Sequence, residues 1–275
     1  MIFVIVLLFG LIIGSFLNVC IARVPLEKSI ISPPSHCPRC KTPIRWYDNI
    51  PLVSYAMLRG RCRTCGQHIS WRYPLVELLN GLLFLLAFSE FGFTGETLLV
   101  MALCSSLVVI TFIDLDHQII PDVITYPGMV IGLVVAPFFM TTLAGPLPFG
   151  LDGVLPFLGQ YSTSFLNALI GLLLGGAPLY LIGFLWEKLR KVEAMGGGDV
   201  KYMAMVGGFL GWKGAFLTIM LGAMSGSIVG VTLIVLKKHQ ADKVIPFGPF
   251  LAFGTLLTLF RGPEIIAWYL GLIRI

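Results

Sequence analysis

Two groups of ionisable residues stand directly beside long apolar runs. The first, residues 112–122, reads Phe-Ile-Asp-Leu-Asp-His-Gln-Ile-Ile-Pro-Asp and includes Asp114. The second, residues 196–201, reads Gly-Gly-Gly-Asp-Val-Lys and places Asp199 at the start of another apolar run. Charge at membrane depth is costly, so ionisable residues there mark functional sites by default. We therefore expect Asp114 and Asp199 to carry chemistry.

A pair of carboxyl groups that share one site is suited to aspartic protease chemistry. Two such groups at close range do not both ionise easily, so one keeps a proton while the other acts as a base. The base takes a proton from water, and the protonated group polarises the scissile carbonyl. The glycines Gly196, Gly197 and Gly198 would let the backbone approach an extended substrate and adopt positive φ. The pattern predicts Asp114 and Asp199 as a catalytic pair without a metal ion.

Neighbouring charged residues have simpler interpretations. Asp122 follows Pro121 and is expected to cap the N-terminus of the next helix. Lys201 is expected to offset the charge of Asp199 or to extend toward lipid headgroups. Both also remain candidates for the active-site loop, together with the three glycines. Asp116 projects from a different helix face than Asp114 and is expected to be solvated.

Four of the six cysteines form two close pairs. The pairs are Cys37-Pro-Arg-Cys40 and Cys62-Arg-Thr-Cys65, with twenty-one residues between them. This spacing lets each pair hold a tetrahedral metal ion from adjacent turns and is typical of zinc sites. Two disulfides are the alternative and would fit an oxidising compartment. Four thiolates leave no open position for water, so we expect a structural zinc ion.

The composition indicates that most of the chain has the bilayer as its solvent. Of its 275 residues, 57% are hydrophobic and 12% are charged, and the mean hydropathy is +0.91. A soluble domain carries about 25% charged residues. A spanning helix needs roughly 20 apolar residues. We expect an all-α polytopic membrane protein with about eight spans, at residues 1–20, 74–91, 98–113, 123–142, 165–186, 200–210, 215–236 and 247–260.

Lys and Arg are distributed unevenly among the predicted loops. One side of the membrane holds sixteen of the nineteen, nine of them in residues 23–73. Cytoplasmic loops are enriched in Lys and Arg, so this side is predicted to be cytoplasmic and both termini to face outward. The sequence pI of about 8.9 then reflects topology and anionic lipid, not nucleic acid binding.

Residues 23–73 form a Pro- and Cys-rich soluble segment that follows a first transmembrane helix in residues 1–22. The hydrophobic core of a segment this small gives only marginal stability without a metal ion or disulfides. A cytoplasmic segment lies in a reducing compartment, which favours zinc over disulfides. Residues 74–275 are expected to form a seven-helix membrane part that holds both carboxyl groups.

Taken together and in order, the motifs resemble those of the bacterial type IV prepilin peptidases, membrane proteases with a GxGD motif. The resemblance covers essentially the whole chain. It is carried by Gly-Ser-Phe-Leu-Asn-Val at 14–19, the cysteine pairs, Tyr-Pro-Leu-Val-Glu-Leu at 73–78, the segment 114–122, Gly-Gly-Gly-Asp-Val-Lys at 196–201 and Pro-Phe-Gly-Pro-Phe at 246–250.

The resemblance implies more than the residues show by themselves. Asp114 and Asp199 match the two catalytic aspartates of the family. The substrates would be prepilins and type II secretion pseudopilins, cut after a Gly at the cytoplasmic face of the bacterial inner membrane, with the pilus or secretion assembly machinery as partner. Many members also methylate the new N-terminus with S-adenosylmethionine. Asn18 and Glu77 are candidates for shaping that second site, and helix–helix hydrogen bonding is the alternative for both.

Two other classes of function compete with the protease. A transporter or proton relay would bind an ion at Asp114 and Asp199, but it predicts broken helices near the midplane and symmetric halves. The two predicted acids lie at one membrane face, and the halves of this sequence do not resemble each other. A scaffold that docks partners through its zinc segment would leave the two acids unexplained. The protease uses both.

Overall fold

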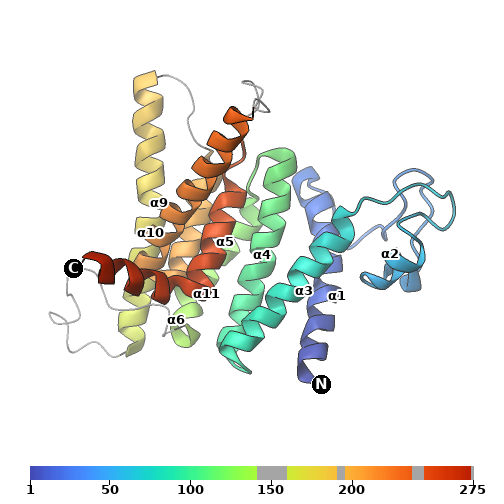
Figure 1. The fold of residues 1–275 in the computed structure, drawn as a ribbon, viewed down its shortest axis with the longest axis horizontal. Coiled ribbons are helices and arrows are strands. Elements are labelled where there is room, and N and C mark those ends of the chain that lie inside the picture. Colours follow the sequence, from blue (N-terminus) through green and yellow to red (C-terminus); the bar gives the residue numbers. More distant parts are fainter. Residues whose placement is uncertain (141–159, 191–195, 237–244, 274–275) are drawn as a thin grey trace. The chain divides into compact units, whose positions relative to one another are not determined.

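The computed structural model describes residues 1–140, 160–190, 196–236 and 245–273. Within these ranges the chain is almost entirely helical, with no β-strand and two isolated β-bridges, which confirms the predicted all-α fold. Figure 1 shows the helices in chain order. Their bounds are α1 Ile2–Arg23, η1 Val24–Leu26, η2 Trp46–Asn49, α2 Val53–Met57, α3 Arg72–Phe91, α4 Gly95–His117, α5 Asp122–Val134, α6 Ala136–Phe139, α9 Gln160–Arg190, α10 Gly197–Val235 and α11 Gly248–Ile273.

Six helices in the described part are long and apolar enough to cross a membrane, namely α1, α3, α4, α9, α10 and α11. The predicted span at 123–142 instead contains α5, which is shorter, and the single turn α6. The break lies where Pro137 follows α5, because proline lacks an N–H and its ring clashes with the carbonyl four residues earlier. Residues 141–142 of that predicted span lie outside the described residues.

Helix α10 contains two predicted spans, 200–210 and 215–236, and turns back on itself between them. Gly211 has φ 69° and ψ −178°, which is not helical. A Cβ atom on Gly175 of α9 would lie 2.2 Å from the carbonyl oxygen of Met203 and 3.5 Å from the Cβ of Ala215. Along a straight helix these two residues would be about 18 Å apart. The segments 197–210 and 212–235 are therefore two antiparallel arms, as the two separate spans required.

The chain forms two compact units, Met1–Ile113 and Asp114–Ile275. In the first, α1 packs closely against α3. A Cβ on Gly14 would lie 2.7 Å from the Cα of Glu77, so only glycine permits this approach. The Asn80 side-chain amide donates to the carbonyl oxygen of Gly10 at 2.7 Å and accepts from the Ser105 hydroxyl at 3.0 Å, which joins α1, α3 and α4.

In the second unit both arms of α10 bind α11. The Tyr202 hydroxyl in the first arm is hydrogen-bonded to the Thr255 hydroxyl at 2.7 Å, and Thr218 in the second arm donates to Thr258 at 3.2 Å. Helix α9 approaches the first arm still more closely. A Cβ on Gly171 would lie 2.2 Å from the carbonyl oxygen of Gly207. Small residues at such positions let membrane helices pack backbone to backbone.

We expect Gly171→Ala to destabilise the second unit. The nearest atom to the new methyl group is a backbone oxygen, so α9 and α10 must separate, and overpacking of this kind costs about 1–3 kcal/mol. The thermal unfolding midpoint in detergent should fall by about 2–4 °C for each kcal/mol. Gly271→Ala in α11, whose Cβ would meet no heavy atom within 4 Å, is the control. Equal midpoints for the two variants would contradict the packing described here.

Candidate functional site

The two cysteine pairs sit in two hairpins with the same backbone pattern. In the first, the Cys37 N–H donates to the Thr42 carbonyl, and Lys41 donates back to Cys37. In the second, Cys62 donates to Gln67, and Gly66 donates back to Cys62. Lys41 and Gly66 both have left-handed φ, 57° and 68°. The bridges His36–Pro43 and Arg61–His68 close the two hairpins. The two cysteine hairpins are therefore a structural repeat that is not evident from the sequence.

The four sulfur atoms converge at one point. The Sγ atoms of Cys37 and Cys65 are 3.8 Å apart, those of Cys40 and Cys62 are 4.0 Å apart, and all four ligand atoms lie within 4.8 Å of one another. A tetrahedron with zinc–sulfur bonds of about 2.3 Å has sulfur–sulfur edges of about 3.8 Å. None of the four is disulfide-bonded. The cluster fits a zinc ion.

The thiol chemistry of this cluster agrees with metal binding. A hydrogen bond between the Cys40 thiol and the Thr42 hydroxyl lowers the pKa of Cys40 to about 6. Hydrogen bonds from the backbone N–H groups of Cys65 and Thr64 lower the pKa of Cys62. Metals bind the thiolate form, so these contacts prepare the sulfurs of Cys40 and Cys62 as ligands, whereas the pKa of Cys65 is raised to about 11. Arg39 also donates to the Gln67 side chain at 2.6 Å and ties the two hairpins together.

Asp114, near the end of α4, is buried, with 6% of its surface exposed. Its Oδ2 atom accepts a hydrogen bond of 2.9 Å from the N–H of Gly248, the first residue of α11. The N-terminus of a helix favours negative charge because its first N–H groups lack partners within the helix. A Cβ on Gly248 would lie 2.6 Å from the same oxygen. Gly248 therefore both binds Asp114 and leaves the space that its carboxylate occupies.

Asp199 lies in the first turn of α10, and the charge of Asp114 acts on its carboxyl group. Its backbone N–H donates to the carbonyl of Gly196 at 3.2 Å. Among the described residues, no side-chain or backbone donor binds the Asp199 carboxyl group. Asp114 is thus fixed by the protein, whereas Asp199 keeps its oxygens available to water or a substrate.

Further contacts join the segments that hold the two acids. A Cβ on Gly198 would lie 3.0 Å from the Cβ of Ile120. The Lys201 Nζ atom lies 2.7 Å and 2.8 Å from the two carboxylate oxygens of Asp122 and stacks over the Tyr126 ring. The two clusters predicted from sequence, which are far apart along the chain, therefore meet in one place.

Three expectations about this segment were wrong. The N-cap of α5 is Pro121, without a side-chain hydrogen bond, and Asp122 is the first helical residue, with its carboxylate bound to Lys201. Lys201 accordingly pairs with Asp122 and not with Asp199. The glycines at 196–198 all lack positive φ, because Gly197 and Gly198 already belong to α10. Gly198 supplies space for Ile120, and the Cβ position of Gly197 is open.

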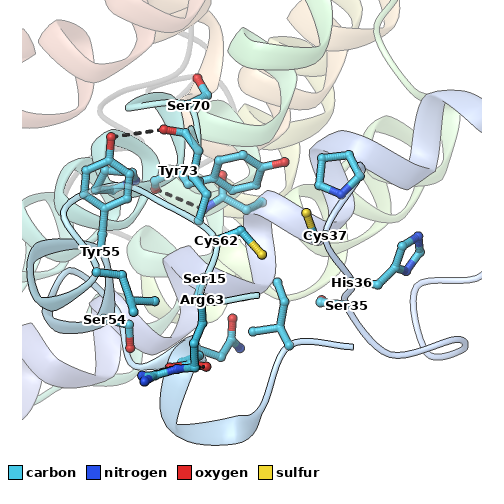
Figure 2. Close-up of a pocket in the computed structure, with 18 of the residues that line it drawn as sticks. Ser15, Ser35, His36, Cys37, Ser54, Tyr55, Cys62, Arg63, Ser70 and Tyr73 are labelled. Carbon is cyan, nitrogen blue, oxygen red and sulfur yellow. Dashed lines mark hydrogen bonds and ion pairs between the residues drawn. The ribbon is translucent and has the colours of Figure 1, made fainter. Parts of the chain in front are cut away.

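The first unit also contains a cavity of about 530 Å³, a size typical of small-molecule sites. It is lined by α1, both cysteine hairpins, α2 and the start of α3, with Ser15, Tyr55, Arg63 and Tyr73 among its side chains. Figure 2 shows the sulfur atoms of Cys37 and Cys62 on its wall. Sequence reasoning did not find this cavity, because its lining is drawn from many short segments.

Asn18 and Glu77 both line the cavity, but they make different contacts. The Asn18 amide donates to the carbonyl oxygens of Tyr73, at 3.1 Å, and Gly14, at 3.4 Å, so it links α1 to the start of α3. This is the helix–helix hydrogen bonding that stood as the alternative. Glu77 accepts a hydrogen bond of 2.9 Å from the N–H of Leu52 and so anchors the soluble segment to α3.

Two protein-family models match this chain. Residues 8–91 match the bacterial peptidase A24 N-terminal domain, and residues 101–231 match the type IV leader peptidase family. A prepilin leader peptidase/N-methyltransferase of Aeromonas salmonicida is 37% identical over 98% of this chain and 94% of its own length. A protein of the same name from Pseudomonas aeruginosa is 35% identical over 96% of this chain and 92% of its own length.

A third protein of that name, from Myxococcus xanthus, is 43% identical over 82% of this chain, and the alignment covers 61% of that protein. No solved structure is a significant match. Because relatives of this name align with it over more than nine-tenths of both chains, the chain belongs to the type IV leader peptidase family.

Proposed function

We propose that the chain is an aspartic endopeptidase that removes the leader peptides of type IV prepilins and type II secretion pseudopilins. The observation that carries the proposal is the meeting of Asp114 and Asp199, two acids on separate membrane helices. The relatives are named prepilin leader peptidase/N-methyltransferase, which agrees with this proposal. No resident metal ion is needed, because the pair itself supplies an acid and a base.

The geometry suggests how cleavage would proceed. The two carboxyl groups share a proton and hold a water molecule between them and the scissile carbonyl. The ionised group takes a proton from that water as it attacks, and the protonated group donates its proton to the carbonyl oxygen, which gives a tetrahedral gem-diol. The C–N bond then breaks as the first group gives its proton to the departing nitrogen, and the second group recovers a proton from the gem-diol. Gly248 keeps Asp114 in place during these transfers. The open backbone at Gly196 and Gly197 would accept the extended chain of the substrate, and the Asp122–Lys201 pair would hold this loop against α5.

The substrate would meet these groups at the cytoplasmic face of the inner membrane. The excess of Lys and Arg on one side supports this orientation, with the soluble segment inside and both termini outside. A short basic leader that ends in Gly would lie in the cytoplasm, and its apolar continuation would lie in the bilayer beside the first arm of α10. Cleavage would deliver the mature protein to the pilus or secretion assembly machinery.

We also propose that the first unit methylates the new N-terminus. The cavity beside the cysteine cluster, with Asn18 and Glu77 in its wall, is where S-adenosylmethionine would bind and supply the methyl group. The zinc ion would be structural, because four sulfurs fill its tetrahedral shell. Residues 23–73, together with Asn18 and Glu77 of the flanking helices, would then serve methylation, and the two acids in residues 74–275 would serve cleavage.

Replacing either acid should abolish cleavage. Asp114→Asn and Asp199→Asn each remove one ionisable partner, and acid–base groups contribute about 10²–10⁴-fold. Cleavage of a co-expressed prepilin, followed by the gel shift on leader loss, measures the effect. Asp116→Asn, an exposed acid on the same helix, is the matched control and should cleave normally. Normal cleavage by Asp114→Asn or Asp199→Asn would remove that residue from the catalytic pair.

Gly248→Ala should slow cleavage without preventing folding. The added methyl group would displace the Asp114 carboxylate, and a shift of about 1 Å can cost about a hundredfold. We expect kcat to fall and KM to stay near the wild-type value, because the substrate surface is unchanged. Gly262→Ala in α11, whose Cβ would be 3.5 Å from its nearest neighbour, is the control. Equal kcat values for the two variants would show that Gly248 does not position Asp114.

Purified protein should contain about one zinc ion per chain, because four thiolates complete one tetrahedral site. Cys62→Ser should lower the zinc content and reduce methylation more than cleavage. Elemental analysis gives the metal content, and mass spectrometry of the mature pilin detects the added methyl group. Cys20→Ser, in α1 and outside the cluster, should retain zinc. A zinc-free wild type with two disulfides would refute the metal site.

A further inference from the structure

Glu77 is a buried acid in an otherwise apolar membrane helix. Its surface is 8% exposed, and its position on α3 places it in the wall of the cavity. It accepts a hydrogen bond of 2.9 Å from the N–H of Leu52, and Ser15 lines the same wall. A carboxylate offers about four acceptor positions, so the group retains capacity for a further donor.

The other charged side chains of the cavity wall already have partners. Arg63 binds both carboxylate oxygens of Asp48, at distances between 2.6 and 3.1 Å. Arg23 donates to the backbone carbonyls of Ser29 and Pro33. No lysine, arginine or histidine within the described ranges forms an ion pair with Glu77. It is the one acid of this wall without a cationic partner there.

A buried carboxylate without a counter-charge is costly, and an ionisable residue inside a membrane segment marks a functional site by default. The rest of the wall suits a cation as well. Tyr55 and Tyr73 line the same cavity (Figure 2), and the faces of aromatic rings attract positively charged groups. A volume of about 530 Å³ has room for an organic cation and not only for a metal ion.

We propose that Glu77 is the cation-binding residue of this cavity. The inference rests on the methylation activity proposed above and states which chemical group its site recognises. Both reactants of that reaction carry an organic cation: the methyl donor has sulfonium and ammonium groups, and the mature pilin has an N-terminal ammonium. Either one would place a positive charge against Glu77 and take the hydrogen-bonding capacity that the Leu52 N–H leaves.

The test compares Glu77→Gln with Glu90→Gln in the full-length protein in lipid nanodiscs. Glu90 is an exposed acid near the other end of α3, so its variant controls for the loss of one negative charge from this helix. Equilibrium dialysis with labelled S-adenosylmethionine gives the Kd of the donor. Steady-state methylation of a mature pilin gives the KM of the acceptor. A hydrogen bond to a charged group corresponds to roughly a tenfold change or more in affinity.

Glu77→Gln should raise either the Kd of the donor or the KM of the acceptor at least about tenfold. Glu90→Gln should change neither constant. A higher Kd for S-adenosylmethionine identifies the donor as the cation, and a higher pilin KM with unchanged donor Kd identifies the N-terminal ammonium. Glu77→Asp keeps the charge and should recover part of the loss, which a merely structural role would not produce. Prepilin cleavage by each variant reports whether the bundle has folded.

Unchanged Kd and KM in Glu77→Gln, with a methylating wild type, would overturn the proposal for Glu77 and leave the proposed function intact. The same loss in Glu77→Asp as in Glu77→Gln would overturn it too. Failure of the wild type to bind S-adenosylmethionine and to methylate would instead refute the methyltransferase activity, and the inference would fall with it. The two failures are therefore told apart by the wild-type control.

Discussion

The hydrogen bond between the Gly248 N–H and the Asp114 carboxylate is the contact on which the proposed peptidase site depends. An acid in an apolar bundle needs a donor, and here the donor is the free N-terminus of a helix. A side chain on residue 248 would occupy the position of the carboxylate, so the contact requires glycine. Helix α11, the last of the described helices, is thereby tied to Asp114 at the end of α4, more than a hundred residues earlier.

The two acids are held in different ways, and the difference matters for the chemistry. Asp114 is buried and bonded to Gly248, while Asp199 is half-buried and binds no donor in the described part of the chain. In the cysteine cluster, four sulfur atoms surround one point, where a bound metal ion would offset the negative charge of the thiolates.

Much of this arrangement could be predicted from local sequence. The apolar runs gave the spans, and even the pair at 200–210 and 215–236 is present as two arms of α10. The cysteine spacing gave the sulfur cluster. The contacts that were missed join distant segments: Asp122 with Lys201, Asp114 with Gly248, and Glu77 with Leu52. A proline before Asp122 and three glycines before Asp199 suggest caps and turns by local rules, but tertiary contacts decided otherwise.

The short first arm of α10 explains how Asp199 can reach a peptide bond at membrane depth. Residues 197–210 extend about 21 Å, whereas the hydrocarbon core is about 30 Å thick. In the proposed topology, the Lys213 side chain, after the turn at Gly211, would extend to the headgroups and place that end of the arm at one surface. The other end, which carries Asp199, would then stop about 9 Å short of the opposite surface. A leader junction drawn toward the acids would therefore be cut just inside the lipid boundary, where the apolar part of a prepilin begins.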